Sequence, residues 1–481
     1  MSTLATPVKA PPAEKRTDDG ALDPVAKLEL LCDPGSFSPV RSGVRSLHLG
    51  ERGSGGDGVV AGAGRVGGRP IFCYAQDRRF MGGSLGAAHA DSIVRVMNLA
   101  GQAGVPVVGF VESGGARLQE GHAALAGYGR IFRASVELST RVPQISIVSG
   151  ISAGGGAYSP ALTDFVVMTE SARMFLTGPQ VVRDALGEEI SMLDLGGPGV
   201  HSRNGVCQLV APGVAGAVTH ARTLLGYLPS RFDRPEPLVP SPPGETTPDP
   251  SAEVPAEARR IYDVRSVAEA LCDGGELLEL GEGWARNIVT AFGRIDGRAV
   301  GIVANQPRRL GGVIDSEASE KAALFVDSCA RFQLPLVVLV DTPGFMPGSG
   351  QERAGVIRHG ASLLRAFAAA RVPKLTVVLR KAYGGAVITM NSKDLGADLV
   401  FAWPSAEIGI MAARQAVGIV HRRDLEAASD PDAARDQLAG AYTEEHLRAD
   451  AAARAGFVDE VIEPAETRAR LAWALGALEG R

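Results

Sequence analysis

The sequence predicts an α/β protein with two homologous domains, related by an internal duplication. Two observations carry this prediction. Apolar, strand-like runs alternate with helical stretches in both halves of the chain. A glycine-rich motif also occurs twice, as Gly154-Gly155-Gly156 after the apolar run 145–148 and as Gly384-Gly385 after the run 375–379. We therefore expect one domain at 21–228 and a second at 257–481.

Further motifs repeat at a nearly constant spacing. The segment 64–69 returns at 293–298, and Gly82-Gly83 returns as Gly311-Gly312, both 229 residues later. Gly154-Gly155 returns as Gly384-Gly385 at an offset of 230. One residue of drift between positions 64 and 154 indicates a duplication rather than chance similarity.

Each half is expected to contain the same elements in the same order. A glycine-rich hairpin is followed by a helix, a strand that ends in an acidic and glycine-containing turn, a second helix, and a strand that ends in the double glycine. The helices are predicted at 87–102 and 121–138 in the first half, and at 317–332 and 351–370 in the second. Residues 428–481 are predicted to be a terminal helical segment packed on the second half. Parallel strands bind ligands at their carboxyl ends, so the two glycine turns are candidate sites.

Composition and charge exclude several functions. The chain has 481 residues, 45% of them apolar, and a net charge of −5, which gives no reason to expect nucleic acid or an anionic membrane as a partner. A polar, disordered start is predicted at 1–20, without a signal peptide, and a proline-rich linker at 229–256. The uncharged window 142–163 contains Pro143, Gln144 and several glycines, which favours a buried strand and loop over a membrane span.

Cysteine usage favours a reducing compartment, the cytoplasm. The five cysteines are far apart and form no C-x-x-C pair, so a cysteine zinc site is not expected. The sequence also has no H-E-x-x-H motif, and we expect no metal.

Two other activities match short motifs. Gly150-Ile151-Ser152-Ala153-Gly154 fits the G-x-S-x-G elbow of serine hydrolases, but the second copy has Ala382 in place of Ser152, and no downstream histidine stands out. Asp341-Thr342-Pro343-Gly344 resembles the D-x-x-G element of GTPases, but the chain lacks the phosphate-binding loop G-x-x-x-x-G-K-[ST].

Backbone chemistry explains both glycine turns. Glycines after a strand allow positive φ angles and bring bare N–H groups against a ligand. Two such turns suit a reaction in which negative charge develops on two carbonyl oxygens, such as a thioester oxygen and a ureido oxygen.

The chain resembles the carboxyltransferase (beta) subunits of biotin-dependent acyl-CoA carboxylases, the acetyl- and propionyl-CoA carboxylase beta family. The matching segments, in order along the chain, are Asp33–Phe37, Glu112–Arg117, Tyr158–Phe165, Phe175–Pro179, Ala318–Ala323, Asp341–Phe345 and Arg380–Ala386. The resemblance implies two crotonase-like (ClpP/crotonase) domains. It also implies transfer of a carboxyl group from carboxybiotin to the α-carbon of an acyl-CoA, with the biotin nitrogen removing the α-proton.

The resemblance also implies binding residues. The thioester oxygen would lie on the N–H groups of Gly154 and Gly155, with Gly156 as a further donor, and the ureido oxygen on those of Gly385 and Ala386. The other implied contacts to acyl-CoA are Gly114, Gly115, Ala116, Arg117, Gly156 and Tyr158; those to biotin are Tyr383, Gly384, Val387, Ile388, Pro343, Gly344 and Phe345. On this basis Gly155→Val and Gly385→Val are both expected to abolish turnover with little loss of folding.

The implied partners are a separate biotin carboxylase and biotin carrier protein (the alpha subunit), and five further copies of the chain in a hexamer, a trimer of dimers. The sequence departs from the family at Val387-Ile388 and at Met411-Ala412-Ala413. Two alternatives use the same fold: a biotin-dependent decarboxylase of a malonyl- or glutaconyl-type CoA thioester, and a non-catalytic subunit that assembles a carboxylase.

Overall fold

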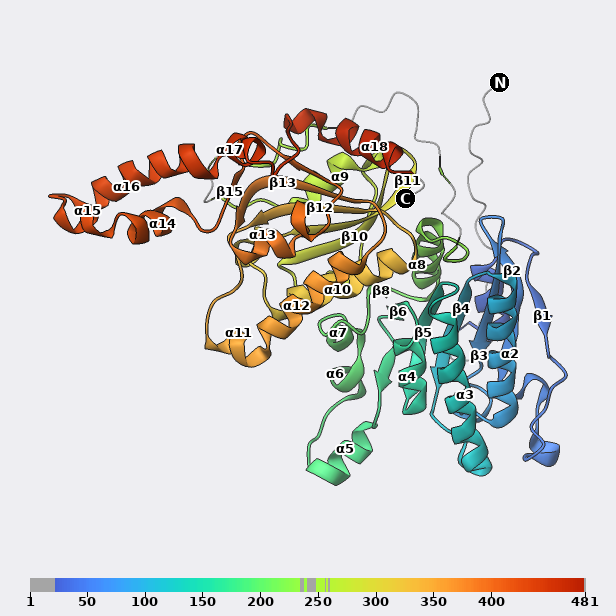
Figure 1. The fold of residues 1–481 in the computed structure, drawn as a ribbon. Helices are drawn as coiled ribbons and strands as arrows, with labels where there is room; N and C mark the ends of the chain where they lie inside the picture. Colours follow the sequence, from blue (N-terminus) through green and yellow to red (C-terminus); the bar gives the residue numbers. More distant parts are fainter. Residues whose placement is uncertain (1–21, 234–237, 240–247, 256, 258–259, 480–481) are drawn as a thin grey trace, which may run out of the picture. The chain divides into compact units, whose positions relative to one another are not determined.

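The computed structural model describes residues 22–233, 238–239, 248–255, 257 and 260–479. The chain divides into two compact units, Met1–Phe232 and Asp233–Arg481, and each is built around one eight-stranded sheet (Figure 1). The predicted disordered start at 1–20 lies outside the described residues, as does part of the predicted linker at 229–256.

The first unit contains a sheet and the helices that cover it. Its strands are β1 (Ser38–Val40), β2 (Val59–Val66), β3 (Arg69–Gln76), β4 (Val107–Ser113), β5 (Gln144–Ala153), β6 (Phe165–Thr169), β7 (Arg173–Phe175) and β8 (Leu209–Ala211). Its α-helices are α1 (Pro24–Leu31), α2 (Ala87–Ala103), α3 (His122–Leu138), α4 (Gly155–Ala161), α5 (Pro179–Leu186), α6 (Met192–Gly196), α7 (Pro198–His201) and α8 (Val214–Tyr227). Short 3₁₀ turns lie at η1 (Gly50–Arg52), η2 (Gly55–Gly58), η3 (Met81–Gly83) and η4 (Leu118–Glu120).

The strand order of this sheet brings several chain segments to one edge. The order is β1-β2-β3-β4-β5-β6-β8, with β7 paired to β5. Strands β3 to β6 are parallel, so β3, β4 and β5 end at the same edge. Because β2 is antiparallel to β3, with Val59 opposite Gln76, the loop before β2 reaches that edge as well.

Helices α2 and α3 form because their apolar residues recur on one face. Ile93, Val96 and Met97 of α2 and Ile131 and Leu138 of α3 are buried in one cluster with strands β2 to β4. Burying such a side chain contributes about 1.5–3 kcal/mol. The two predicted helices, 87–102 and 121–138, are confirmed within a residue or two.

The second unit repeats this architecture. Its strands are β9 (Leu277–Glu279), β10 (Ile288–Ile295), β11 (Arg298–Asn305), β12 (Leu336–Thr342), β13 (Lys374–Tyr383), β14 (Leu399–Ala402), β15 (Glu407–Gly409) and β16 (Glu460–Val461). Its helices are α9 (Val264–Leu271), α10 (Ser316–Arg331), α11 (Ser349–Ala354), α12 (Val356–Ala369), α13 (Gly385–Thr389), α14 (Ala413–Val420), α15 (Arg422–Ala427), α16 (Pro431–Tyr442), α17 (Ala449–Arg454) and α18 (Thr467–Ala477). Short turns are η5 (Asp273–Gly275), η6 (Leu310–Gly312), η7 (Lys393–Leu395), the π-turn η8 (Thr443–Leu447) and η9 (Pro464–Glu466).

Strand pairing confirms the predicted duplication. The second sheet has the order β16-β14-β13-β12-β11-β10-β9, with β15 on β13 as β7 is on β5. The hairpins also match: β2 and β3 pair through Val66 and Arg69, and β10 and β11 through Ile295 and Arg298. Both units are therefore α/β domains of mainly parallel strands.

The repeat also includes an aspartate that caps each hairpin. Asp33 accepts the N–H groups of Gly67 and Gly68 at the first hairpin, and Asp273 accepts those of Asp296 and Gly297 at the second. Each aspartate is the last residue of a tripeptide Leu-Cys-Asp, but the two are 240 residues apart (273 − 33). The offset of 229 that relates the other motifs does not relate these two aspartates, because the segment between Asp33 and its hairpin is longer.

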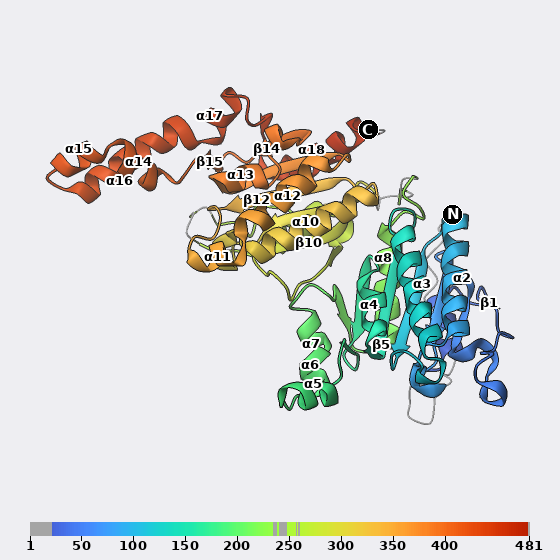
Figure 2. The ribbon, with the colours of Figure 1, turned by 60° about the horizontal axis from the view of Figure 1, so that its bottom comes forward.

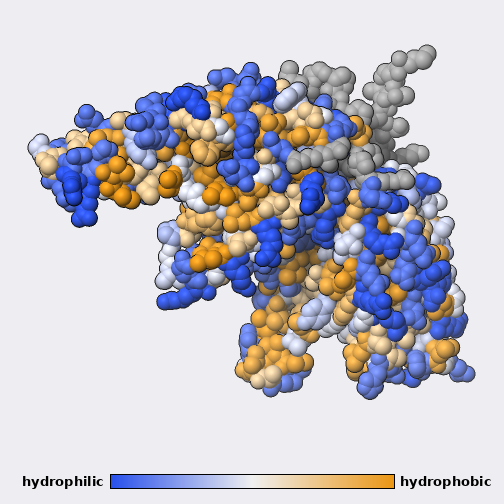
Figure 3. Space-filling view, in the orientation of Figure 1, coloured by the Kyte–Doolittle hydropathy of each residue, from blue (hydrophilic) through white to orange (hydrophobic). Residues whose placement is uncertain are grey.

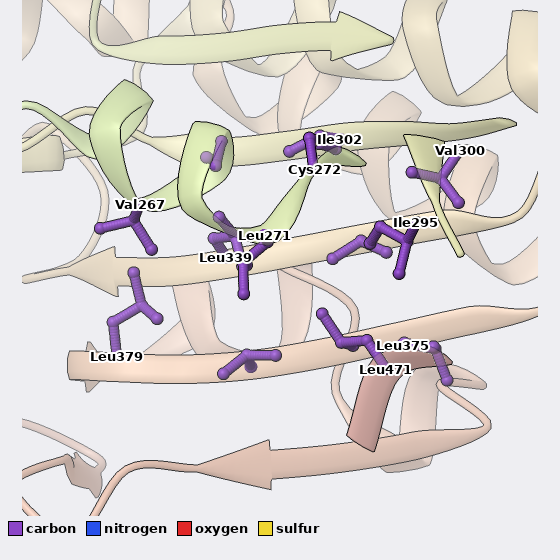
Figure 4. Close-up of a cluster of buried hydrophobic side chains, with 14 of the residues drawn as sticks. Val267, Leu271, Cys272, Ile295, Val300, Ile302, Leu339, Leu375, Leu379 and Leu471 are labelled. Atoms are coloured by element: carbon purple, nitrogen blue, oxygen red, sulfur yellow. The ribbon is translucent and has the colours of Figure 1, made fainter. Parts of the chain in front are cut away.

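The core of the second unit lies between the sheet and helices α9 and α18. Figure 4 shows Val267 and Leu271 of α9 and Leu471 of α18 facing Leu339 and Leu375 of the sheet. All five side chains are fully buried.

Two expected helical segments differ from the structure. The predicted helix 351–370 is divided at Gly355, whose φ of 79° ends α11 before α12 begins, because the left-handed conformation breaks the helical hydrogen-bond ladder. Of the segment 428–481, α18 packs on the sheet as predicted, whereas α16 instead packs against α14, and α14 to α16 project from the sheet (Figures 1 and 2).

All five cysteines are free and buried. Among the residues that the structure describes, no helix is long and apolar enough to cross a membrane.

Candidate active site

The two glycine turns have the same backbone geometry. Each follows a long strand and opens a short helix: β5, Gly154 and α4 in the first unit, and β13, Gly384 and α13 in the second. Gly154 has φ 58° and ψ −125°, and Gly384 has φ 65° and ψ −151°. Side chains avoid this region, so both positions require glycine.

Each turn leaves two N–H groups without a partner in the described residues. Gly155 and Gly156 are the first residues of α4, and Gly385 and Ala386 the first of α13, where no helical acceptor exists. Gly385 is exposed and Gly155 partly exposed, whereas Gly156 and Ala386 are buried. Each turn therefore has one N–H group on an exposed or partly exposed residue and one on a buried residue, and neither has an acceptor among the described residues.

The expectation that Gly154 donates to a ligand is wrong. Its N–H donates to the carbonyl of Phe175 at the end of β7, at 3.0 Å. In the second unit, the N–H of Gly384 likewise donates to the carbonyl of Gly409 at the end of β15, at 2.9 Å. The donor pairs are thus Gly155 with Gly156 and Gly385 with Ala386, and the short strands β7 and β15 fix their orientation.

The space around Gly155 differs from that around Gly385. A Cβ atom on Gly155 would lie 2.8 Å from the ring of Tyr128, whose hydroxyl is hydrogen-bonded to Ser113 Oγ at 2.9 Å and whose pKa burial raises to about 12. A Cβ atom on Gly385 would meet nothing within 4 Å. The expectation that Gly155→Val spares folding is therefore wrong, because valine would collide with a buried ring, whereas Gly385 leaves room for a substitution.

A second loop approaches each turn. In the first unit Gly114 and Ala116 flank Gly115, whose φ is 100° and whose N–H donates to Ser113 Oγ. A Cβ on Gly115 would lie 3.6 Å from Ala153 O, so this loop borders the turn. In the second unit Gly344, between Pro343 and Phe345, would place a Cβ 3.8 Å from Tyr383 O. The structure thus brings together the residues predicted on each side.

Corresponding side chains, Tyr158 and Ile388, lie two residues beyond the second donor of each pair. Tyr158 is half exposed and its ring lies edge-on to Phe132. Ile388 occupies the corresponding place in the second unit and is also half exposed, next to the partly buried Val387. These side chains are accessible to a ligand at the turns.

Two predicted contact residues are instead tied to other parts of the protein. Tyr383 is buried and its hydroxyl donates to Glu407, and burial raises the pKa of this phenol above its usual range. Arg117 is fully buried and paired with Asp57 and Glu120. The expectation that Arg117 touches a ligand is therefore wrong for this structure, since protein groups surround its guanidinium.

The serine of the hydrolase motif is not a nucleophile in this geometry. Ser152 is fully buried, and its hydroxyl donates to the carbonyl of Gly156 at 2.7 Å. No histidine in the described residues is hydrogen-bonded to it, so the serine supports the turn rather than reacting.

Several supporting residues could not be expected from the sequence. Phe175 and Gly409 act through carbonyl oxygens, which carry no sequence signature, and Glu407 lies 24 residues from Tyr383. The pair Lys27 and Glu112 joins α1 to the end of β4. The one sequence signal that could have identified supporting residues is the tripeptide Leu-Cys-Asp, which occurs at 31–33 and at 271–273 and contains the aspartate that caps each hairpin.

Comparison with known proteins gives a family over nearly the whole chain. The model of the carboxyl transferase domain matches residues 15–481. The carboxyltransferase subunit of propionyl-CoA carboxylase from Haloferax mediterranei is 48% identical over 420 residues, 86% of this chain and 81% of that protein. The alpha subunit of methylmalonyl-CoA decarboxylase from Veillonella parvula is 42% identical, over 98% of this chain and 94% of that protein.

The fold has a close match among solved structures. The crystal structure of transcarboxylase 12S, a hexamer with methylmalonyl-CoA and methylmalonic acid bound, matches with a TM-score of 0.92 and 45% identity, over 95% of this chain and 89% of that one.

Proposed function

This chain belongs to the carboxyl transferase family, and from that premise we propose that it transfers the carboxyl group of carboxybiotin to the α-carbon of an acyl-CoA. The carboxybiotin is carried by a separate biotin carrier protein, which a biotin carboxylase loads. The observation that carries the proposal is the duplicated donor pair, Gly155 with Gly156 and Gly385 with Ala386, within two crotonase-like domains.

In the first unit, the donor pair would bind the thioester oxygen of the acyl-CoA. When the α-proton leaves, negative charge develops on this oxygen, and N–H groups fixed by β7 stabilise it without reorganising. Gly114, Gly115, Ala116 and Tyr158 border this site. Removing one such donor in other enzymes costs about 10²–10³ in rate.

In the second unit, the donor pair would bind the ureido oxygen of biotin. Gly385 has open space where a ligand atom would lie, and its N–H and that of Ala386 suit a carbonyl-type acceptor. When bound, carboxybiotin supplies the carboxyl group and a nitrogen base for the α-proton, so no protein base is needed. Bordering residues are Pro343, Gly344, Phe345, Gly384, Val387 and Ile388.

The proposal includes a homo-hexamer in the cytoplasm. Transcarboxylase 12S forms a hexamer. In this chain, helix α5 has no buried residue, and its apolar side chains Val181 and Leu186 are exposed. The apolar surface over α5 and α6 is seen in Figure 3 and suits contact with a second copy. The free cysteines agree with a reducing compartment.

The direct test supplies ATP, labelled bicarbonate, a biotin carboxylase, a biotinylated carrier protein and a panel of acetyl-, propionyl- and longer acyl-CoAs. We expect acid-stable label in at least one acyl-CoA. No labelled product with any of them would contradict the proposal and favour a non-catalytic assembly subunit.

A decarboxylase is the second candidate, because the relative from Veillonella parvula carries that activity in its name. The same donor pairs would act on a malonyl- or methylmalonyl-type thioester. Incubation of such a thioester with free biotin and without ATP separates the two: transfer of carboxylate to biotin at a rate above that of the forward reaction would favour decarboxylation.

Ser152→Ala tests the rejected hydrolase activity. We expect it to keep turnover within about threefold of the wild type, since loss of a nucleophilic serine instead costs about 10⁶-fold. The measurement is the initial rate of labelled acyl-CoA formation. A loss of several orders of magnitude in a folded variant would contradict the supporting role of this serine.

A further inference from the structure

A buried ion cluster lies beside the first glycine turn; we call Ser46, Asp57, Arg117 and Glu120 the Arg117 latch. Arg117 Nη1 donates to Asp57 Oδ1 at 2.6 Å and to Glu120 Oε1 at 2.8 Å. Ser46 Oγ donates to the same Glu120 oxygen at 2.7 Å. The side chains of Asp57, Arg117 and Glu120 are 0% exposed, so these charge-assisted bonds are shielded from solvent.

The latch joins three segments at the carboxyl edge of the first sheet. Ser46 and Asp57 belong to the loop before β2, and Arg117 follows β4. The start of α2 is held as well, because Glu120 accepts the N–H of Ala87 and Asp57 accepts that of His89. Arg117 Nη2 also donates to Ser84 O at 2.9 Å.

The latch is continuous with the loop that borders the donor pair. Ala116 forms a parallel bridge with Leu85, and Leu85 N donates to Gly115 O at 2.9 Å. Gly115 in turn lies beside Ala153, the last residue of β5. A displacement at Arg117 would therefore move the segment 114–116 relative to the turn.

Among the described residues of the second unit there is no equivalent of this cluster. Met346 stands at the position of Arg117, at the offset of 229. The loop before the hairpin is also shorter there: Asp33 to Gly67 spans 34 residues (67 − 33), and Asp273 to Asp296 spans 23 (296 − 273). The latch and its longer loop thus belong only to the unit that, on the proposed function, receives acyl-CoA.

Resting on the proposed function, we propose that the Arg117 latch positions the loop 46–58 and the segment 114–116 to receive the CoA thioester. Arg117 is a positioning residue: it acts through these segments and does not touch the substrate. Its planar fork reaches four acceptors, which a lysine ammonium cannot satisfy in the same geometry. Biotin binding in the second unit is independent of the latch.

The test compares Arg117→Lys with the exposed control Arg133→Lys in the full-length protein. We expect Arg117→Lys to raise the KM for acyl-CoA about tenfold or more, because small misplacements of binding segments are costly. The KM for the biotinylated carrier should not change, and hydrogen exchange should increase in residues 46–58. Ser46→Ala removes the hydroxyl's hydrogen bonds with Glu120 and with the N–H of His48 but keeps both ion pairs, so it should raise the KM for acyl-CoA by a smaller factor.

The outcomes separate the latch from the proposed function. Calorimetric titration of the wild type with propionyl-CoA tests acyl-CoA binding without requiring transfer, and absence of binding would overturn both. If the wild type binds and Arg117→Lys has an unchanged KM, the latch proposal alone fails. It also fails if both KM values and kcat change together with a fall in Tm, because the role is then only structural.

Discussion

Gly385→Val is expected to reduce carboxyl transfer by about two to three orders of magnitude while the protein stays folded, since the loss of one oxyanion donor typically has this effect. A Cβ atom on Gly385 would meet no atom outside its own helix within 4 Å, and the φ of Gly385 is not in the left-handed region. The valine methyl groups would instead occupy the space where the ligand oxygen must approach the N–H groups. The measurement is the rate of labelled acyl-CoA formation with saturating carrier.

Gly129→Val is the matched control for this experiment. Gly129 lies in α3, is exposed, and would place a Cβ in open space, so the same substitution should leave the rate unchanged. Binding of propionyl-CoA to Gly385→Val should equal that of the wild type, because the acyl-CoA site is assigned to the other unit. Wild-type turnover in Gly385→Val would contradict the assignment of this turn as a catalytic donor pair.

Gly155→Val would be a poor test of the same idea. Its Cβ would lie 2.8 Å from the Tyr128 ring, so a loss of activity could come from a displaced helix α3 rather than a blocked donor. The two glycines look equivalent in the sequence, and only the structure separates them. The difference depends on a tyrosine that has no counterpart at the corresponding position of the second unit.

The duplicated turns were predictable because they depend on local chemistry. Glycine after an apolar strand, repeated at a constant offset, predicts both the strand and the turn. The choice of donor was not predictable. Gly154, Gly155 and Gly156 are identical residues, and which N–H remains available depends on Phe175, which lies 21 residues further along the chain (175 − 154).

The role of Arg117 shows the same limit. Its motif, Glu112–Arg117, matches the family, and the resemblance alone suggested contact with the ligand. Besides Glu120, three residues further on, its acceptors come from Asp57 and Ser84, which no spacing rule connects to it. A sequence pattern therefore identified an important residue but not whether it binds the substrate or holds the binding segment.

Lys27→Met is expected to destabilise the first unit by about 3–5 kcal/mol, because it removes one partner of a buried ion pair. Lys27 Nζ donates to Glu112 Oε1 at 2.7 Å, and their side chains are 2% and 6% exposed. Ser149 Oγ would be the remaining donor to this oxygen, at 2.8 Å. For a unit of this size the loss corresponds to a fall in Tm of about 6–20 °C, which scanning calorimetry measures.

The double variant Lys27→Met/Glu112→Met provides the control. It removes both charges, so no carboxylate is left buried without a cation, and we expect it to recover most of the lost Tm. A single variant within about 1 kcal/mol of the wild type would mean that Glu112 is neutral or finds another donor. In the second unit Asp341 is at the position that corresponds to Glu112, at the offset of 229. Its cation is Arg380, which lies on β13 itself, whereas the cation of Glu112 is Lys27 on helix α1. The first unit therefore depends on helix α1 for a charge that the second unit supplies from its own sheet, so Lys27→Met should lower the stability of the first unit alone.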